Sequence, residues 1–565
     1  MTRADRQSQW AGWVTTVLGM LWLAQFPLWQ DGSYSRITHS KWMGMLILTG
    51  MTAAACGYML YTLIAQGELK RQVRLNWLHA AALGYFWLVA LSAFFGTWAD
   101  YNNDAGQLVV FHGAKRYEGL ITHGCYGMIF LCMSLTRVRL RYLLDAEACA
   151  LLVFTVVAGL QYHEVNVLEL FPAGTSIRTN YEFQGTIGNI DMVVGYLAVA
   201  MAAVLGGFAV MERPGVLWLI SGLAAVLLVL MTEVQCGLIM LAALLFLLAL
   251  LALRRPACRW RVLVILGGSL VMLSVRLLTG LPWLDGTEEL LFPHALSWWK
   301  LIPALLGAAL IGLAPVLRRW RGGALPLPAV CGIAAALVIL AMLAVYFAPI
   351  PAGNGLWELQ EILHGRLQDA FGSERIGIWR MTLEMSRDNL LWGTGPDTFL
   401  YAMEDHMYRT GQSLLQRFDN PHNIILGVLS GSGLPAAVLF VVLTLGAVAH
   451  GLIRAEKDVQ VWPLLLAVIC YMTQGMFTFS ICLVTPMFWA ALGMLTGQLS
   501  AQTDDSASWV EAGKDVVIHE TNPELCVPPL GDGCDQAGDV RADRAGADRG
   551  ASRADQLHRI DADQG

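Results

Sequence analysis

The sequence predicts an all-α polytopic membrane protein with about 12 to 14 transmembrane helices and one large extracytoplasmic helical loop. Hydrophobic residues make up 56% of the 565 residues and charged residues only 14%, whereas soluble domains carry about 25% charged residues. Mean hydropathy is +0.53. The apolar residues gather in runs of roughly 20, long enough to cross a bilayer as helices. These runs lie near 10–29, 43–65, 78–96, 119–135, 147–163, 189–210, 215–232, 235–253, 262–279, 299–317, 328–348, 424–450, 461–480 and 482–499.

The placement of lysine and arginine predicts the orientation of these segments, because cytoplasmic loops carry an excess of both. A cytoplasmic N-terminus puts most basic loop residues on the cytoplasmic side. They are Arg3, Arg6, Lys70, Arg71, Arg74, Arg137, Arg139, Arg141, Arg213, Arg254, Arg255, Arg259, Arg261, Arg318, Arg319, Arg321, Arg454 and Lys457. Residues 349–422 are then extracytoplasmic. Their arginines do not contradict this orientation, because long loops are translocated largely regardless of charge.

Hydropathy divides the chain into four parts. Residues 1–348 form an N-terminal transmembrane block, 349–423 a large extracytoplasmic loop, 424–499 the C-terminal transmembrane helices and 500–565 a disordered cytoplasmic tail. The tail has too little apolar sequence to fold alone. The first apolar run lacks a small-residue cleavage pattern and is interpreted as an uncleaved signal anchor. We therefore expect a multi-pass protein of the cytoplasmic membrane.

The large loop is expected to form a small helical cap lying on the membrane. Residues Glu374–Arg387 have helical periodicity, Trp392–Pro396 has the composition of a turn, and Asp397 should cap a second short helix. The residues expected to share one face of the first helix are Ile376, Trp379, Leu383 and Ser386.

The segment Asn420–Asn423 carries the first candidate for chemistry. Asn420 followed by Pro421 is typical of a helix N-cap and first helical residue. His422 and Asn423 would then occupy the first turn of a membrane helix, whose positive end favours anions and disfavours a charged imidazole. His422 should therefore be neutral near pH 7 and able to accept a proton, and Asn423 beside it is a candidate for binding substrate. An ordinary helix cap with a solvent-facing histidine is the alternative.

Basic residues supply candidates for binding phosphate. Arg375 and Arg380 flank Trp379 on the first loop helix, and arginine binds phosphate with two parallel hydrogen bonds. Arginines near a bilayer also contact lipid headgroups, which is the alternative role.

Polar residues at the predicted ends of two further spans are also candidates. Lys115, Arg116 and Glu118 precede one span, whereas Arg178 and Asn189 precede another. Such residues either bind substrate or cap helices. The sequence has no phosphate loop, nucleotide-binding glycine motif or Ser-His-Asp pattern, and its eleven cysteines are scattered singly. We expect no cofactor, no bound metal and no nucleic-acid partner.

The order of several short motifs resembles the O-antigen ligase and O-antigen polymerase family of bacterial membrane proteins. Gly185–Asn189 is similar to the family's G-T-x-G-N entry to a membrane helix. Arg375, four residues before Trp379, resembles its arginine-tryptophan block. Leu391–Gly395 with Phe399 resembles its glycine-rich turn, although the usual preceding proline is absent.

Two further blocks extend the resemblance over roughly residues 185–499. His422 and Asn423, followed by Gly431–Leu434, resemble the family's histidine-asparagine block, with Ser432 where an acid is usual. Gln474–Ser480 is similar to its closing spans. One departure concerns the Ser-Arg pair of a middle span, where this chain has Gln235. Arg116 or Arg178 would then help hold the pyrophosphate.

The resemblance implies a metal-independent, inverting glycosyltransferase of the polytopic C-type fold, with its catalytic loop outside the membrane. The donor would be an oligosaccharide on a polyprenyl diphosphate such as undecaprenyl diphosphate, and the acceptor a glycan, lipid or protein. Arg375, with other arginines, would hold the diphosphate, and His422 would deprotonate or orient the acceptor hydroxyl. Ligation and repeat-unit polymerisation both stay open. The alternatives are a transporter or flippase of lipid-linked sugars and an inactive scaffold.

Overall fold

The computed structural model describes residues 3–172, 174–177, 183–279, 298–320, 322–353, 355–412 and 418–500. The first helices are α1 (Arg3–Met20), α2 (Phe26–Leu28), α3 (Ile37–Ala65), α4 (Leu69–Gln72), α5 (Trp77–Phe95), α6 (Val109–His112), α7 (Leu120–Ser134), α8 (Leu140–Tyr162), α9 (Ile190–Val210) and α10 (Val216–Thr232). The others are α11 (Gln235–Arg254), α12 (Arg259–Thr279), α13 (Ile302–Arg319), α14 (Leu327–Phe347), α15 (Gly355–Leu363), α16 (Arg375–Asp388), α17 (Phe399–Thr410), α18 (Ile424–Ala455), α19 (Trp462–Gly475) and α20 (Thr485–Ser500). Within the described residues, the one pairing of extended backbone is an isolated bridge between Asn102 and Leu108.

The chain is an all-helical polytopic membrane protein, as its hydropathy predicts. Ten helical stretches of the described chain are long and apolar enough to cross a membrane. Three shorter apolar helices accompany them, at Leu120–Ser134, Val216–Thr232 and Val459–Gly475. The expected number of about 12 to 14 spans includes these short helices and α20, which has 16 residues. The predicted tail at 500–565 lies outside the described residues, apart from Ser500.

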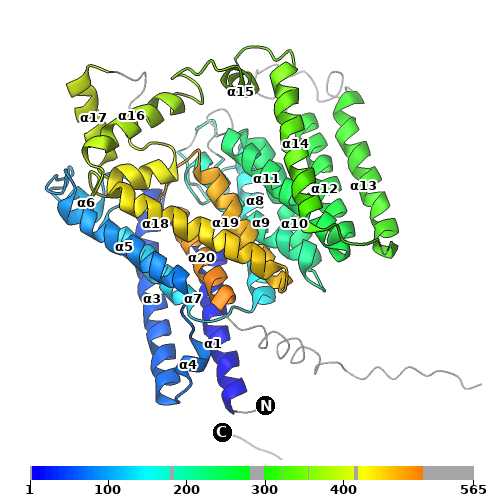
Figure 1. The fold of residues 1–565 in the computed structure, drawn as a ribbon, viewed down its shortest axis with the longest axis horizontal. Helices are drawn as coiled ribbons and strands as arrows, with labels where there is room; N and C mark the ends of the chain where they lie inside the picture. The colour runs from blue at the N-terminus through cyan, green and yellow to red at the C-terminus, as the bar shows by residue number, and fades with distance from the viewer. Residues whose placement is uncertain are drawn as a thin grey trace, which may run out of the picture. The chain divides into compact units, whose positions relative to one another are not determined.

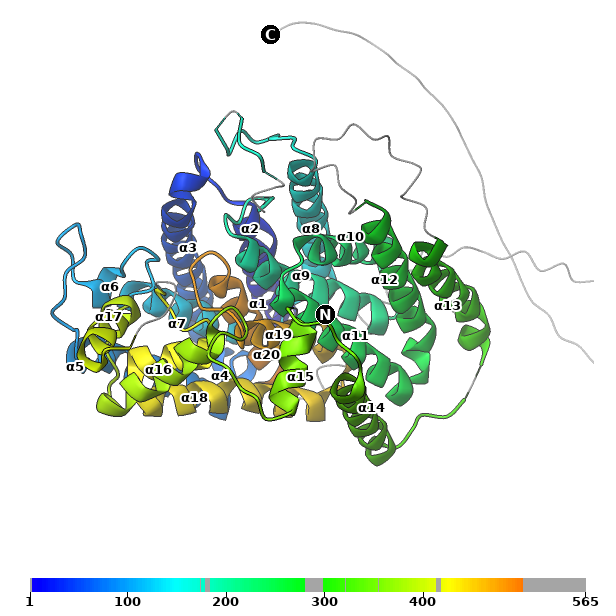
Figure 2. The same ribbon diagram turned by 90° about the horizontal axis from the view of Figure 1, so that it is seen from above.

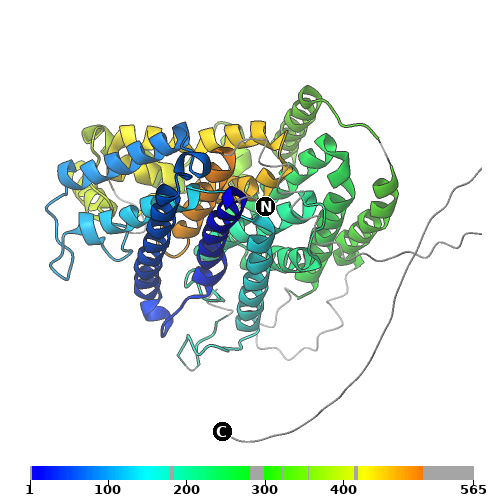
Figure 3. The same cartoon turned by 90° about the horizontal axis from the view of Figure 1, so that it is seen from below.

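Helix α9 is at the centre of the membrane block. Every residue from Met192 to Val210 is buried, which explains why its sequence is apolar on all faces. It packs against α8, α10, α11 and α19. The side chain of Asn189 accepts hydrogen bonds from the N–H groups of Asp191 and Met192, at 2.9 and 3.2 Å, so Asn189 caps this helix, which was the alternative to substrate binding. Figure 3 shows α1 between α3 and α8, with which it is also in contact.

Residues 355–412 form the helical cap, in which α16 and α17 lie against α18 (Figure 1). The predicted helix at Glu374–Arg387 is confirmed as α16. The residues that α16 and α17 bury together are Ile378, Met381, Met385, Phe399, Ala402 and Met403. The predicted apolar face is wrong at Leu383, whose side chain is exposed. The reason is that Ile378, Met381 and Met385 form a second stripe at helical spacing, and this stripe faces α17.

A break in α18 holds the glycine-rich turn that precedes α17. Gly433 has a φ of 81° inside the helix, and a Cβ there would lie 2.3 Å from the carbonyl oxygen of Leu391, so only glycine fits. The Thr394 N–H then donates to the Ser430 carbonyl at 2.8 Å, and the Gly395 N–H donates to the Gly431 carbonyl at 2.9 Å. The turn is therefore fixed along the first half of α18, the part of the helix beside α16 (Figure 2).

Candidate functional site

The loop between α19 and α20, residues 476–484, joins the cap to the membrane helices. The Met476 carbonyl accepts a hydrogen bond from Asn423 Nδ2 at 3.0 Å, and the Phe477 carbonyl accepts one from Arg375 Nε at 3.1 Å. These carbonyls follow the end of α19, so no helical N–H groups compete for them. The loop therefore brings the start of α16 next to the start of α18.

Arg375 has its guanidinium anchored but not neutralised. Its Nη1 donates to the Gly372 carbonyl at 2.7 Å, in addition to the bond from Nε. No carboxylate among the described residues lies within ion-pair distance of it. It does interact electrostatically with Asp191, in the first turn of α9. A guanidinium held by carbonyl groups keeps its full positive charge available to an anion.

The start of α18 differs from the prediction by three residues. Asn423, not Asn420, is the N-cap, and its side chain accepts from two N–H groups of the first turn, at 3.0 Å each. Asn420 instead accepts from the His422 N–H at 2.9 Å. His422 has a φ of 47° and precedes the helix. The local Asn-Pro signal is overridden because Asn423 is also tied to the α19–α20 loop.

His422 lies between two aromatic rings and is held neutral. The centroids of Phe418 and Phe479 lie 5.8 and 5.3 Å from the imidazole, both edge-on. Burial, together with the positive charges of Arg375 and Arg116, lowers the pKa of His422 to about 4. Its Nδ1 is buried and has no hydrogen-bond partner among the described residues. The imidazole is therefore neutral, as expected. The causes are burial and the two arginines, and not a position in the first turn of the helix.

Arg116 contacts the same Phe479 ring as His422. Its guanidinium is 3.9 Å from the Phe479 centroid, and it pairs with both carboxylate oxygens of Asp419, at 2.6 and 2.8 Å. Lys115, its neighbour, is exposed. Residues far apart in sequence therefore place two arginines, Arg116 and Arg375, around His422.

Asp397 fixes the loop that carries Arg116. Its Oδ2 accepts from the Ala114 N–H at 2.7 Å and from the Glu118 N–H at 3.2 Å. The prediction that Asp397 caps the second cap helix is wrong, since the N-cap of α17 is Thr398 and has no side-chain cap bond. Backbone N–H groups from a loop far away in sequence bind this carboxylate instead, and sequence spacing does not reveal such contacts.

Glu118 is a buried acid in a network of hydroxyl groups. Its side chain is only 7% exposed. Tyr126 donates to Oε1 at 2.7 Å, and Ser480 Oγ lies 3.1 Å from Oε2 and 3.1 Å from Thr485 Oγ1. Burial raises the pKa of Glu118 to about 8, although the Tyr126 hydrogen bond acts in the opposite direction. Glu118 is therefore largely protonated at neutral pH.

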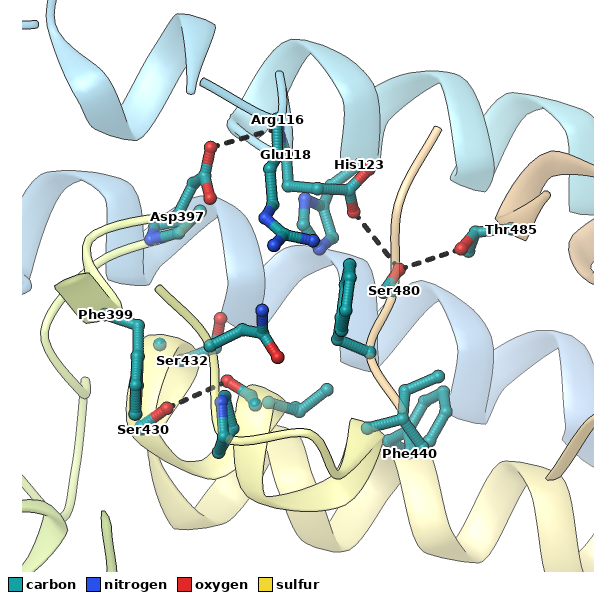
Figure 4. Close-up of a pocket in the computed structure, with 18 of the residues that line it drawn as sticks. Arg116, Glu118, His123, Asp397, Phe399, Ser430, Ser432, Phe440, Ser480 and Thr485 are labelled. Atoms are coloured by element: carbon teal, nitrogen blue, oxygen red, sulfur yellow. Dashed lines mark hydrogen bonds between the residues drawn. The ribbon is translucent and has the colours of Figure 1, made fainter. Parts of the chain in front are cut away.

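A cavity of about 100 Å³ opens beside Glu118. Figure 4 shows Arg116, Glu118 and Ser480 on one side of it and Ser430 and Ser432 on the other. Asn423, one of the predicted binding residues, also lines it, whereas Arg375 and His422 do not. The site thus has two parts: an arginine–histidine region around Phe479, and a cavity that shares Arg116 and Asn423 with it.

The remaining predicted residues lie apart from this group or outside the description. Arg380 is exposed and pairs with Asp369 at 2.6 Å and Glu384 at 3.1 Å, on the cap. Asn189 is the N-cap of α9. Arg178 lies outside the described residues. The structure therefore brings together Arg375, His422, Arg116, Glu118 and Asn423.

Three functional candidates escape prediction from the sequence. Asp419 and Asp397 lie next to residues that motifs had marked, but their partners belong to the loop before α7. Phe479, which contacts both Arg116 and His422, lies in the closing block of the family resemblance. Its place in that block is the signal that could have identified it.

The family model described as O-antigen ligase matches residues 298–441, a stretch that contains α16, α17 and the first half of α18. The match supports the O-antigen ligase and polymerase family. No curated protein matches the chain.

Proposed function

We propose that this chain, which carries an O-antigen ligase family domain at residues 298–441, transfers a glycan from a polyprenyl diphosphate to an acceptor hydroxyl at the outer face of the cytoplasmic membrane. The domain supports O-antigen-ligase-type glycan transfer in general. The donor, the extracytoplasmic placement of the cap, inversion at the anomeric carbon and independence of metal ions are our proposals.

Arg375 and Arg116 are proposed to bind the diphosphate. Both guanidinium groups influence Asp191 and His422 electrostatically, so they act on one small region. The first turns of α9 and α11 lie there too, because Asp191 and Cys236 both interact with Arg375. Helix N-termini and arginines stabilise anions, and they do so most strongly where water is excluded. As the glycosidic bond breaks, negative charge grows on the diphosphate at this position.

His422 is proposed to receive the proton. The acceptor oxygen attacks the anomeric carbon, the bond from that carbon to the diphosphate oxygen breaks, and the acceptor proton passes to the imidazole. A neutral histidine is required for this step. Its pKa of about 4 belongs to the protein without donor. A bound diphosphate offsets the charges of the two arginines and so makes the imidazole more basic.

The observation that carries the proposal is the meeting of Arg375, Arg116 and His422 around the α19–α20 loop. Arg375 bonds to the Phe477 carbonyl, while Arg116 and His422 contact the Phe479 ring. Separate segments of the chain supply the two cations and the one neutral base that the reaction needs.

The test uses the full chain in lipid vesicles, with a fluorescent oligosaccharide on polyprenyl diphosphate, a crude acceptor extract and EDTA. Released polyprenyl diphosphate is measured, with the size of the glycan product. We expect release by the wild type and its loss in His422→Ala and Arg375→Ala. Larger products in steps of the repeat unit indicate polymerisation, and a single addition indicates ligation.

Matched controls separate chemistry from folding. Arg387→Ala removes an exposed arginine from the same helix as Arg375, and His163→Ala removes an exposed histidine after α8. Both should leave release unchanged. Donor that crosses the membrane intact without release of diphosphate would contradict the proposal and favour a flippase.

A further inference from the structure

The cavity beside Glu118 is large enough for a ligand. Its volume of about 100 Å³ corresponds to roughly seven to ten water molecules, at about 10–15 Å³ each by the same measure. One sugar ring with its hydroxyl groups needs comparable room. Glycines of α18, Gly427 and Gly431, line one side, and the absence of their side chains leaves this space open.

The inner wall of the cavity is aromatic. Trp489 stacks with Tyr85 at a centroid distance of 5.7 Å and with Tyr126 at 6.4 Å, and Phe440 and Phe488 complete this wall. Aromatic faces carry partial negative charge, whereas the C–H groups of a pyranose face carry partial positive charge. A wall of this kind, with a few placed polar groups, is typical of a small-molecule site.

Glu118 supplies the acceptor atoms inside the cavity. Its carboxyl oxygens are hydrogen-bonded to Tyr126 and Ser480, and the backbone of Cys482 supplies a third hydrogen bond. A carboxyl group has about four positions for hydrogen bonds, so Glu118, which lines the cavity, can bond to one further group. A hydroxyl group of a sugar could make this further hydrogen bond.

The charges that line the cavity select among sugars. Asp397 and Asp419 face a single arginine, Arg116, which already pairs with Asp419, and the third acid, Glu118, is largely protonated. His123 also lines the cavity. An additional carboxylate would therefore be repelled or desolvated without a partner, whereas a neutral or amino sugar would not.

We propose that this cavity binds one neutral or amino sugar ring of the glycan substrate, with Glu118 hydrogen-bonded to its hydroxyl groups and the Trp489 wall against its face. The inference rests on the proposed function for the class of substrate. The ring belongs either to the donor glycan or to the acceptor, and both share this chemistry.

The test compares a cavity-filling variant with a matched control. A Cβ at Gly427 would meet only Pro421 Cγ, at 3.8 Å, so Gly427→Leu fills the cavity without a backbone clash. Gly50→Leu adds the same side chain on α3, where a Cβ meets nothing within 4 Å. Glu118→Gln keeps the shape of the acid and replaces its carboxyl group with an amide, which cannot ionise.

Binding is measured with fluorescent neutral, amino and uronic-acid disaccharides, and separately with glycan-free polyprenyl diphosphate. We expect the wild type to bind a neutral or amino disaccharide and to bind the uronic-acid one at least tenfold more weakly. Gly427→Leu should weaken disaccharide binding at least tenfold and Glu118→Gln severalfold. Neither should change binding of polyprenyl diphosphate, and Gly50→Leu should change nothing.

Three outcomes would overturn the inference: no disaccharide binds the wild type, the uronic-acid one binds best, or correctly folded Gly427→Leu binds as the wild type does. The KM values for donor and acceptor then identify the source of the ring, since Gly427→Leu raises only one of them. If disaccharides bind as expected but no diphosphate is ever released, the proposed function is wrong and the sugar-binding role of the cavity is retained. If diphosphate is released and Gly427→Leu leaves both KM values unchanged, the proposed sugar site is wrong and the proposed glycan transfer is retained.

Discussion

Arg116 and Asp419, 303 residues apart, form an ion pair with two hydrogen bonds, three residues before His422. The pair joins the loop that precedes α7 to the segment that carries His422. Both side chains are partly exposed, at 25% and 40%, so the pair is accessible to an anion. A diphosphate that binds Arg116 has to compete with the Asp419 carboxylate.

This competition predicts that Asp419→Asn tightens donor binding. Loss of the carboxylate frees the Arg116 guanidinium, and partly exposed ion pairs contribute about 0.2–1 kcal/mol, which corresponds to a gain of up to roughly fivefold in affinity. Equilibrium binding of fluorescent polyprenyl diphosphate measures it. Weaker binding by a folded Asp419→Asn protein would show that Asp419 positions Arg116 and does not compete with the donor.

Arg375→Lys should fail to replace arginine. Lysine keeps the charge, but it cannot bond simultaneously to the Phe477 and Gly372 carbonyls with the planar geometry of a guanidinium. We expect kcat/KM for donor to fall roughly a hundredfold, as for the loss of one charge-stabilising donor. Initial rates of diphosphate release provide the measurement, with Arg387→Ala as control. An Arg375→Lys protein with wild-type kcat/KM would refute this geometry.

Because of His422, we expect kcat/KM for donor and kcat to fall at different pH values on the acid side of their profiles. Burial and two arginines hold its pKa at about 4 in the protein without donor, so kcat/KM for donor should fall only as the pH drops towards 4. Bound diphosphate offsets the arginine charges and raises the pKa, so kcat should fall at a higher pH. Identical limbs in the two profiles would argue against a base beside the diphosphate. His422→Ala should lower kcat by roughly 10²–10⁴ while donor binding persists.

Glu118 predicts a pH-dependent stability. Its pKa is about 8 in the folded protein and about 4.3 in an unfolded chain. The stabilising contribution of the protonated acid is complete below about pH 4.3 and is lost as the pH rises through about 8. Relative to the wild type, Glu118→Gln should therefore gain thermal stability progressively between these values. Melting of the detergent-solubilised proteins at pH 5, 7 and 8.5 tests this, and a constant difference across that range would contradict the buried acid.

Local sequence patterns predict much of the fold, because membrane helices depend on length and hydropathy. The entry of α9 at Asn189 and the cap helix α16 are two examples. The sequence predicts that α9 spans the membrane. It does not predict that α9 lies at the centre of the helices, because lipid-facing and protein-facing apolar residues look alike in sequence.

The site is predicted less completely, because long-range contacts decide its geometry. His422, Arg375 and Arg116 stand out as residue types in suggestive places. Their grouping depends on the α19–α20 loop, whose carbonyls and Phe479 ring contact all three. Asp397 illustrates the limit, since its neighbours indicate a helix cap and its actual partners are N–H groups more than 270 residues earlier.

The most direct test of the proposed reaction is a single-turnover measurement of polyprenyl diphosphate release in vesicles, in EDTA, with wild type, His422→Ala and Arg375→Ala side by side. We expect the wild type to release one diphosphate for each glycan that it transfers. His422→Ala should bind donor without releasing polyprenyl diphosphate from it, and Arg375→Ala should bind donor poorly. Release at the wild-type rate by His422→Ala, or no release by folded wild type with any donor, would contradict the proposed reaction.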